Sequence, residues 1–105
     1  MIVEYIRYLL TPERAEEFER AYARAGELLD RDEHCLRYDV SRGIEEPRRF
    51  VVRIEWDSVE GHEQGFRRSR GFGEFFDAVK PFFPQIEEMA HYEVRAMPRG
   101  PAEAR

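Results

Sequence analysis

The chain is predicted to form one α+β domain of the ferredoxin-like, split βαβ type, a four-stranded antiparallel sheet with its helices on one face. Segments of strand and helix character follow in the order strand, helix, strand, strand, helix, strand. The 105 residues, 42% of them hydrophobic, suffice for one core and leave no room for a second domain. We expect the domain to span residues 1–95 and a polar tail to span 96–105.

The first strand is expected over residues 2–10, where β-branched and aromatic side chains dominate. The first helix is expected over 11–30, with Thr11 as its N-cap and Pro12 at its first helical position. Its apolar residues recur at helical spacing and form one core-facing stripe: Ala15, Phe18, Tyr22, Ala25 and Leu29.

Two half-buried strands are expected next, over 34–43 and 48–56, because both alternate apolar and polar residues. The segment between them contains Gly43 and Pro47, which is typical of a hairpin loop of medium length. On the second of these strands, one face carries Phe50, Val52, Ile54 and Trp56.

The second crossover is predicted to be a broken helix. Ser58 is a candidate cap for residues 59–69, which Gly61 and Gly65 weaken as a helix. A second helical segment begins near residue 72, and Pro81 and Pro84 are expected to end it. The last strand is expected over 85–94.

Charge and cysteine content exclude several classes of function. The formal net charge of −5 comes from 22 acids interspersed with 17 bases, without the basic stripe that binds nucleic acid. Cys35 is alone, so no disulfide can form within the chain. The sequence shows neither a leader-like N-terminus nor an apolar run of membrane-spanning length, so we expect a cytoplasmic protein that does not contact the membrane.

The sheet face opposite the helices is expected to pair with a second copy of the chain. It would carry Val3, Tyr5, Leu9 and Val51 beside several arginines, which is too apolar for a solvent-exposed surface. A two-fold homodimer is the simplest way to cover it.

Six segments together resemble the antibiotic biosynthesis monooxygenase family of dimeric α+β barrels: MIVEYIRY, TPERAEEFERAY, HCLRYDVSRG, RFVVRIEWDSVEGH, SRGFGEFF and IEEMAHYEV. The resemblance covers roughly residues 1–95 and implies a cavity between sheet and helices in each subunit. Its cofactor-free members oxidise phenolic or anthrone-like polyketides, and the deprotonated substrate itself reduces oxygen. The resemblance therefore implies a small aromatic substrate, molecular oxygen and no cofactor.

Within that cavity, His62 and Trp56 are the candidate catalytic residues, since His62 is the side chain near Trp56 whose ordinary pKa suits a proton acceptor. Glu4 and Ile6 are expected on the same sheet face. The candidate substrate-binding residues are Tyr8, Arg37, Tyr38, Val52, Ile54, Phe66 and Phe76.

Several alternatives stay open. Trp56 could be an ordinary core residue and His62 could face solvent, in which case the chain is a non-catalytic binding or dimerisation module. No metal site is expected, because His34 and Cys35 would point to opposite faces of a strand and His91 has no partner at ligand spacing. Haem degradation is disfavoured, because Ile6 and Phe66 stand where the haem-degrading branch carries Asn and His.

Overall fold

The computed structural model describes residues 1–96 and confirms the predicted ferredoxin-like fold. Its four strands are β1 (Ile2–Leu9), β2 (Cys35–Arg42), β3 (Arg49–Trp56) and β4 (Ile86–Glu93). All neighbours pair antiparallel, in the order β2-β3-β1-β4. Of the predicted polar tail, residues 97–105 lie outside the described part of the chain.

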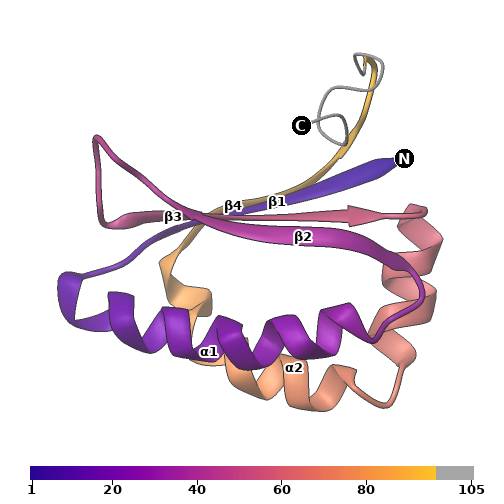
Figure 1. Ribbon diagram of the computed structural model, residues 1–105, viewed down its shortest axis with the longest axis horizontal. Helices are drawn as coiled ribbons and strands as arrows, with labels where there is room; N and C mark the ends of the chain where they lie inside the picture. Colours follow the sequence, from indigo (N-terminus) through magenta and orange to yellow (C-terminus); the bar gives the residue numbers. More distant parts are fainter. Residues whose placement is uncertain (97–105) are drawn as a thin grey trace, which may run out of the picture.

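Both crossovers lie on the same face of the sheet, as predicted (Figure 1). The first is α1 (Pro12–Asp30), and the second is a broken series: a π-helical turn η1 (Gly61–Gly65), a 3-10 turn η2 (Phe66–Arg68), α2 (Phe72–Val79) and a 3-10 turn η3 (Lys80–Gln85). Pro81 and Pro84 lie inside η3 rather than at the end of a continuous helix. Thr11 is the N-cap of α1, as predicted, in an extended conformation and without a side-chain cap hydrogen bond.

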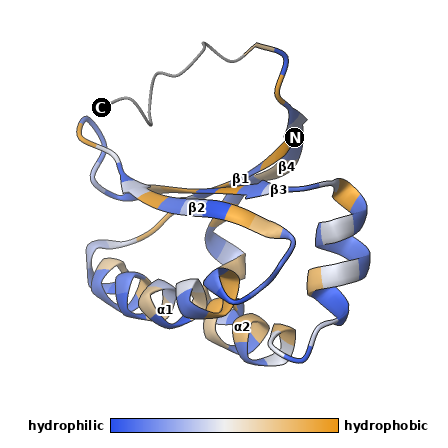
Figure 2. Cartoon of the chain, turned by 45° about the vertical axis from the view of Figure 1, so that its right-hand side comes forward, coloured by the Kyte–Doolittle hydropathy of each residue, from blue (hydrophilic) through white to orange (hydrophobic). Residues whose placement is uncertain are grey.

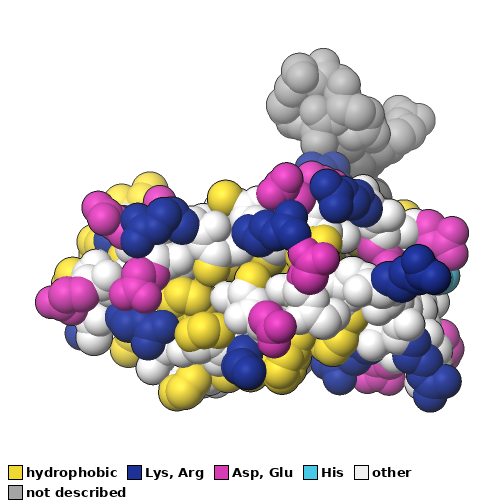
Figure 3. Space-filling view, turned by 90° about the horizontal axis from the view of Figure 1, so that it is seen from below, with side chains coloured by type: hydrophobic (Ala, Val, Ile, Leu, Met, Phe, Trp, Pro, Cys, Tyr) yellow, Lys and Arg dark blue, Asp and Glu magenta, His cyan; other side chains and the backbone are white. Residues whose placement is uncertain are grey.

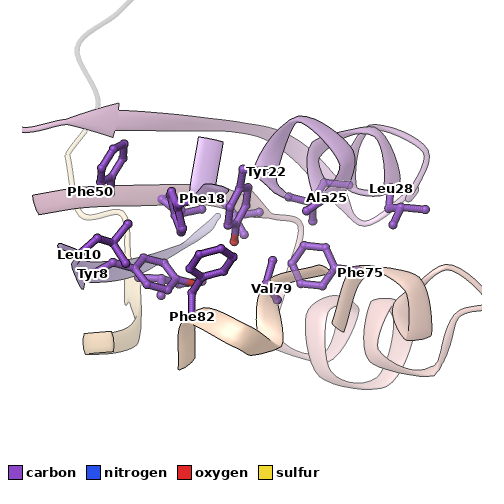
Figure 4. Packing of buried hydrophobic residues seen from close by; sticks show 14 of the residues in the cluster. Tyr8, Leu10, Phe18, Tyr22, Ala25, Leu28, Phe50, Phe75, Val79 and Phe82 are labelled. Atoms are coloured by element: carbon purple, nitrogen blue, oxygen red, sulfur yellow. The ribbon is translucent and has the colours of Figure 1, made fainter. Parts of the chain in front are cut away.

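The core lies between the sheet and the two helices. Figure 4 shows Phe18 and Tyr22 of α1 facing Val79, Phe75 and Phe82 of the second crossover. Phe18 is fully buried, and its ring centroid lies 4.7 Å from that of Tyr8 and 5.0 Å from that of Phe50. These aromatic contacts join α1 to β1 and β3, and they close the end of the core away from Trp56.

Strand alternation sorts side chains between the two faces of the sheet, and Figure 2 shows the alternating hydropathy along the strands. The helix-covered face carries Phe50, Val52, Ile54 and Trp56 of β3, each at most 1% exposed, as the sequence predicts. The outer face carries ion pairs among its apolar residues: Arg7 with Glu88 at 2.7 Å, and Arg53 with Glu55 at 2.6 Å.

Acidic and basic side chains are scattered over the helix side of the described residues. Seen from that side, hydrophobic side chains are visible between them, with several gathered near the middle (Figure 3). Among residues 1–96, no helix combines the length and apolar character needed to cross a bilayer.

Candidate functional site

A cavity of about 220 Å³ lies between the sheet and the second crossover. Its walls are mainly aromatic and aliphatic, and its polar side chains are Glu4, His62 and Arg67 together with the indole of Trp56 and two tyrosines. The aromatic residues that line it are Tyr8, Tyr22, Trp56, Phe66, Phe72, Phe75, Phe76 and Phe83. A cavity of this composition suits a small, planar, largely apolar molecule with few polar groups.

The register of the strands places Trp56 and His91 next to Glu4 at the polar end of the cavity. Glu4 pairs with His91 across the β1–β4 ladder, and Ile2, on the same face of β1, pairs with Trp56 across the β1–β3 ladder. Directly opposite residues of an antiparallel pair project from the same face of the sheet. Glu4, Trp56 and His91 therefore come together although they are far apart in the sequence.

Trp56 fixes the Glu4 carboxylate. The indole N–H of Trp56 donates a hydrogen bond to Oε1 of Glu4 at 3.0 Å, and both side chains are buried. The His62 ring stacks on the indole of Trp56, with ring centroids 4.4 Å apart and an angle of 14° between the ring planes. Trp56 is thus both a core residue and a wall of the cavity.

His62 joins the two strand residues into one cluster. Its Nδ1 lies 2.8 Å from Nε2 of His91, where one nitrogen must donate and the other accept, and its Nε2 lies 3.6 Å from Oε1 of Glu4. Glu4 is 2% exposed and His62 is 4% exposed, whereas His91 is half-buried. The cluster therefore runs from the closed cavity toward solvent.

Burial pushes both inner members of this cluster toward their neutral forms. Desolvation raises the pKa of Glu4 above its ordinary value, although the hydrogen bond from Trp56 opposes the shift. Desolvation also lowers the pKa of His62 to about 3, with further lowering by the charges of Arg67 and His91. At neutral pH, His62 is a neutral hydrogen-bonding group and not a proton acceptor with a pKa near 7.

The π-helical turn that carries His62 is held by a hydrogen bond to Ser58 and by packing against a pair of side chains outside the cavity, His34 and Asp57. Ser58 accepts a hydrogen bond from the Gly61 N–H at 2.9 Å, and His34 Nδ1 lies 2.8 Å from Oδ2 of Asp57. A Cβ atom on Gly61 would overlap Asp57, and one on Gly65 would overlap the His34 ring. The two glycines thus let the turn pack against this pair, and π-helical turns are frequent at functional sites.

The structure brings together six of the nine residues predicted for the site. The cavity is lined by His62, Trp56, Tyr8, Ile54, Phe66 and Phe76. Val52 is fully buried under the core and does not line the cavity. The Tyr38 side chain lies against Gly26 of α1, outside the cavity, and Arg37 lies on the outer face, where it pairs with Glu55 at 3.4 Å.

Sequence reasoning assigned no role to Glu4, His91 and Arg67. The premise that His91 lacks a partner is wrong, because His62 and Glu4 meet it in space. The missing signal was the β1–β4 register, which places Glu4 opposite His91. Ile6 lines the cavity, and the ring centroid of Phe66 lies 5.2 Å from that of Trp56. The two positions compared with the haem-degrading branch therefore carry no haem-binding side chain.

Comparison with known proteins agrees with this geometry. The family model described as antibiotic biosynthesis monooxygenase matches residues 1–78. A crystal structure from Bordetella bronchiseptica that bears the same family name is 29% identical, covers 90% of this chain and 97% of that chain, and has a TM-score of 0.77.

Two more distant relatives extend the comparison. SnoaB, described as a cofactor-independent oxygenase from Streptomyces nogalater, shares the fold at a TM-score of 0.75, with 16% identity over 91% of this chain and 94% of that chain. YczJ, an uncharacterized protein of Bacillus subtilis, is 24% identical over 78 residues, which are 74% of this chain and 82% of YczJ.

Proposed function

Because this chain belongs to the antibiotic biosynthesis monooxygenase family, we propose that it oxygenates a small aromatic, polyketide-like molecule held in the cavity. The observation that carries the proposal is the aromatic cavity of about 220 Å³ with a buried carboxylate and imidazole at one end. That volume is below the range typical of pockets for drug-sized ligands, which favours a substrate of two or three fused rings.

The proposed reaction takes its electrons from the substrate. One atom of O₂ enters a ring CH₂ or CH position as a carbonyl oxygen, and the other leaves as water with two hydrogens from the substrate. The product is a quinone, and no flavin or nicotinamide is consumed. The description of SnoaB as cofactor-independent supports this part of the proposal only by likeness of fold.

The chain's part in the reaction is to bind, orient and exclude water. The aromatic walls around Trp56 and Phe66 pack on the substrate rings, and the acidic substrate hydroxyl faces Glu4 and His62. We keep His62 in the site as a hydrogen-bonding partner of that hydroxyl, in place of the lone general base that the sequence suggested, because its pKa is about 3.

The proposal includes a homodimer formed through the outer face of the sheet. Val51, Tyr5 and Leu9 on that face are only half-buried in the single chain. The cytoplasm is the proposed location, which the lone Cys35 and the interspersed acidic surface favour.

An oxygen electrode tests the proposed reaction. With 1,8-dihydroxynaphthalene or an anthrone, which have a free ring CH or CH₂ position, and without added flavin or NADH, we expect uptake well above the spontaneous rate. His62→Ala should lower the rate roughly 10-fold or more, since it removes a contact to the reacting hydroxyl. Tyr38→Phe, outside the cavity, is the matched control and should leave the rate unchanged.

Thermal melts with the same compounds separate the alternatives. A ligand-dependent rise in melting temperature without oxygen uptake would replace the enzyme with a binding protein. If the compounds cause no oxygen uptake and no shift in melting temperature, the proposal is contradicted and a dimerisation module is the remaining interpretation.

A further inference from the structure

We propose that Glu4, His62 and His91 form a binding site for a divalent transition-metal ion at the polar end of the cavity. One carboxylate oxygen and two imidazole nitrogens, one from each residue, all lie within 4.8 Å of one another. Two histidines and one carboxylate are a donor set that binds Fe²⁺, Co²⁺ or Zn²⁺, whereas Mg²⁺ and Ca²⁺ prefer oxygen donors alone.

The separation of the two imidazole nitrogens fits a shared metal, whereas the Glu4 carboxylate must move toward the same ion, since its 3.6 Å contact is to Nε2 of His62 and not to Nδ1. Metal–nitrogen bonds of about 2.1 Å at right angles place neighbouring donor atoms about 3 Å apart. The 2.8 Å between His62 Nδ1 and His91 Nε2 is close to that separation. A metal between these nitrogens would take the place of their mutual hydrogen bond.

The three donors are fixed by different parts of the fold. Pairing of β1 with β4 holds Glu4 opposite His91, and stacking on Trp56 orients the His62 ring. The indole N–H bonded to Glu4 orients the carboxylate, as outer hydrogen bonds do for metal ligands. Because Glu4 and His62 are almost fully buried, the cluster is a built site and not a chance grouping of surface charges.

The surroundings suggest how such a site would be used. His91 is half-buried, which gives an ion a path from solvent. Three protein donors beside a cavity leave coordination positions open. Arg67 lines the same cavity and its charge opposes a bare cation, but it favours an anionic further ligand such as a phenolate; this last point rests on the proposed function.

Cobalt titration of the metal-depleted full-length protein tests the site. We expect one Co²⁺ per chain by calorimetry, with visible d–d absorption, and displacement by Zn²⁺. Glu4→Gln and His91→Ala should each weaken binding 10-fold or more. Glu87→Gln is the matched control: Glu87 is an exposed carboxylate on β4 that pairs with Arg49 outside the cavity, and binding should be retained.

Ring-proton NMR of the wild-type protein gives a result that does not depend on any variant folding. Substoichiometric Co²⁺ should broaden the ring signals of His62 and His91 before those of His34. Absence of Co²⁺ binding, or broadening that follows His34 instead, would overturn the proposal. Because the assay contains no substrate and no turnover, failure of the oxygen-uptake test leaves its result unaffected, and the reverse also holds.

Discussion

His34 and Asp57 form a pair outside the cavity that packs against the π-helical turn η1. The hydrogen bond that the His34 ring donates to the Asp57 carboxylate raises the pKa of His34 above its ordinary 6.5, and the same bond lowers the pKa of Asp57 below its ordinary 3.8. The stabilisation from His34 is complete below 6.5 and is lost as the pH rises through its raised pKa. The stabilisation from Asp57 is present above 3.8 and is lost as the pH falls through its lowered pKa.

Asp57→Asn should therefore lower the pKa of His34 and destabilise the fold more at pH 5.5 than at pH 8.5. Proton NMR of the imidazole ring measures the first effect, and melts at the two pH values measure the second. Asp39→Asn, an acid on the outer face, should not change the pKa of His34. An unchanged His34 pKa in Asp57→Asn would contradict the hydrogen bond between the two residues.

Individual residues also show what alternation can and cannot predict. The burial of Ile54 and Trp56 on one face follows from a period of two and needs no structure. The same rule separates Arg37 from Tyr38, so the two could not both have lined one cavity. His91 could be placed only by its strand register, which periodicity does not contain.

At the scale of the element, the π-helical turn η1 is the part of the fold that the sequence described least well. Gly61 and Gly65 were interpreted as residues that weaken a helix, whereas in the structure they allow close contact with Asp57 and His34. Glycine is unfavourable for a helix at these two positions, but the absence of a side chain lets the turn pack against His34 and Asp57. The break before α2 agrees with the predicted broken helix, whereas the division of the first segment into η1 and η2 and the 3-10 turn η3 are not in the prediction.

Gly65→Ala should destabilise the protein by about 1 kcal/mol or more, because its Cβ would displace the His34 ring. Gly73→Ala is the matched control: a Cβ there meets nothing within 4 Å, and alanine favours the helix, so we expect a gain of about 0.5–1 kcal/mol. Urea unfolding of both variants measures the difference. Equal stability of the two would show that the turn does not pack tightly on His34.

At the scale of the whole molecule, the outer sheet face is the surface that a single chain leaves least well covered. The sequence led us to expect an apolar face; the structure interleaves Val51 and Tyr5 with ion pairs such as Arg53–Glu55. Because these charges are already paired within the chain, a second sheet could cover them without leaving an isolated buried charge.

Val51→Glu should shift the proposed dimer toward monomer at micromolar concentration, because it puts an unpaired charge into the interface. Sedimentation velocity measures the change. Ala23→Glu, on the exposed side of α1, is the control and should leave the sedimentation coefficient unchanged. A wild-type protein that sediments as a monomer would remove the dimer from the proposal.

The fold class could be predicted from the sequence, since it follows from local periodicity and chain connectivity. The cavity was expected from the resemblance to the family, and strand alternation then placed Ile54 and Trp56 on the face that lines it. The cluster of Glu4, His62 and His91 could not be predicted from the sequence. It depends on the pairing of β1 with β4 and on the geometry of the turn η1, which its glycines alone do not specify.

The pairing of β1 with β4 has a consequence for the order of events during synthesis. Glu4 is synthesised before His91, and His91 lies beyond residue 78, where the family match stops. The central strand β1 must therefore wait for its second neighbour, and the Glu4–His62–His91 cluster is assembled only when β4 docks. A chain that lacks β4 contains most of the residues of the aromatic wall but not His91, so the polar cluster is complete only after β4 has paired with β1.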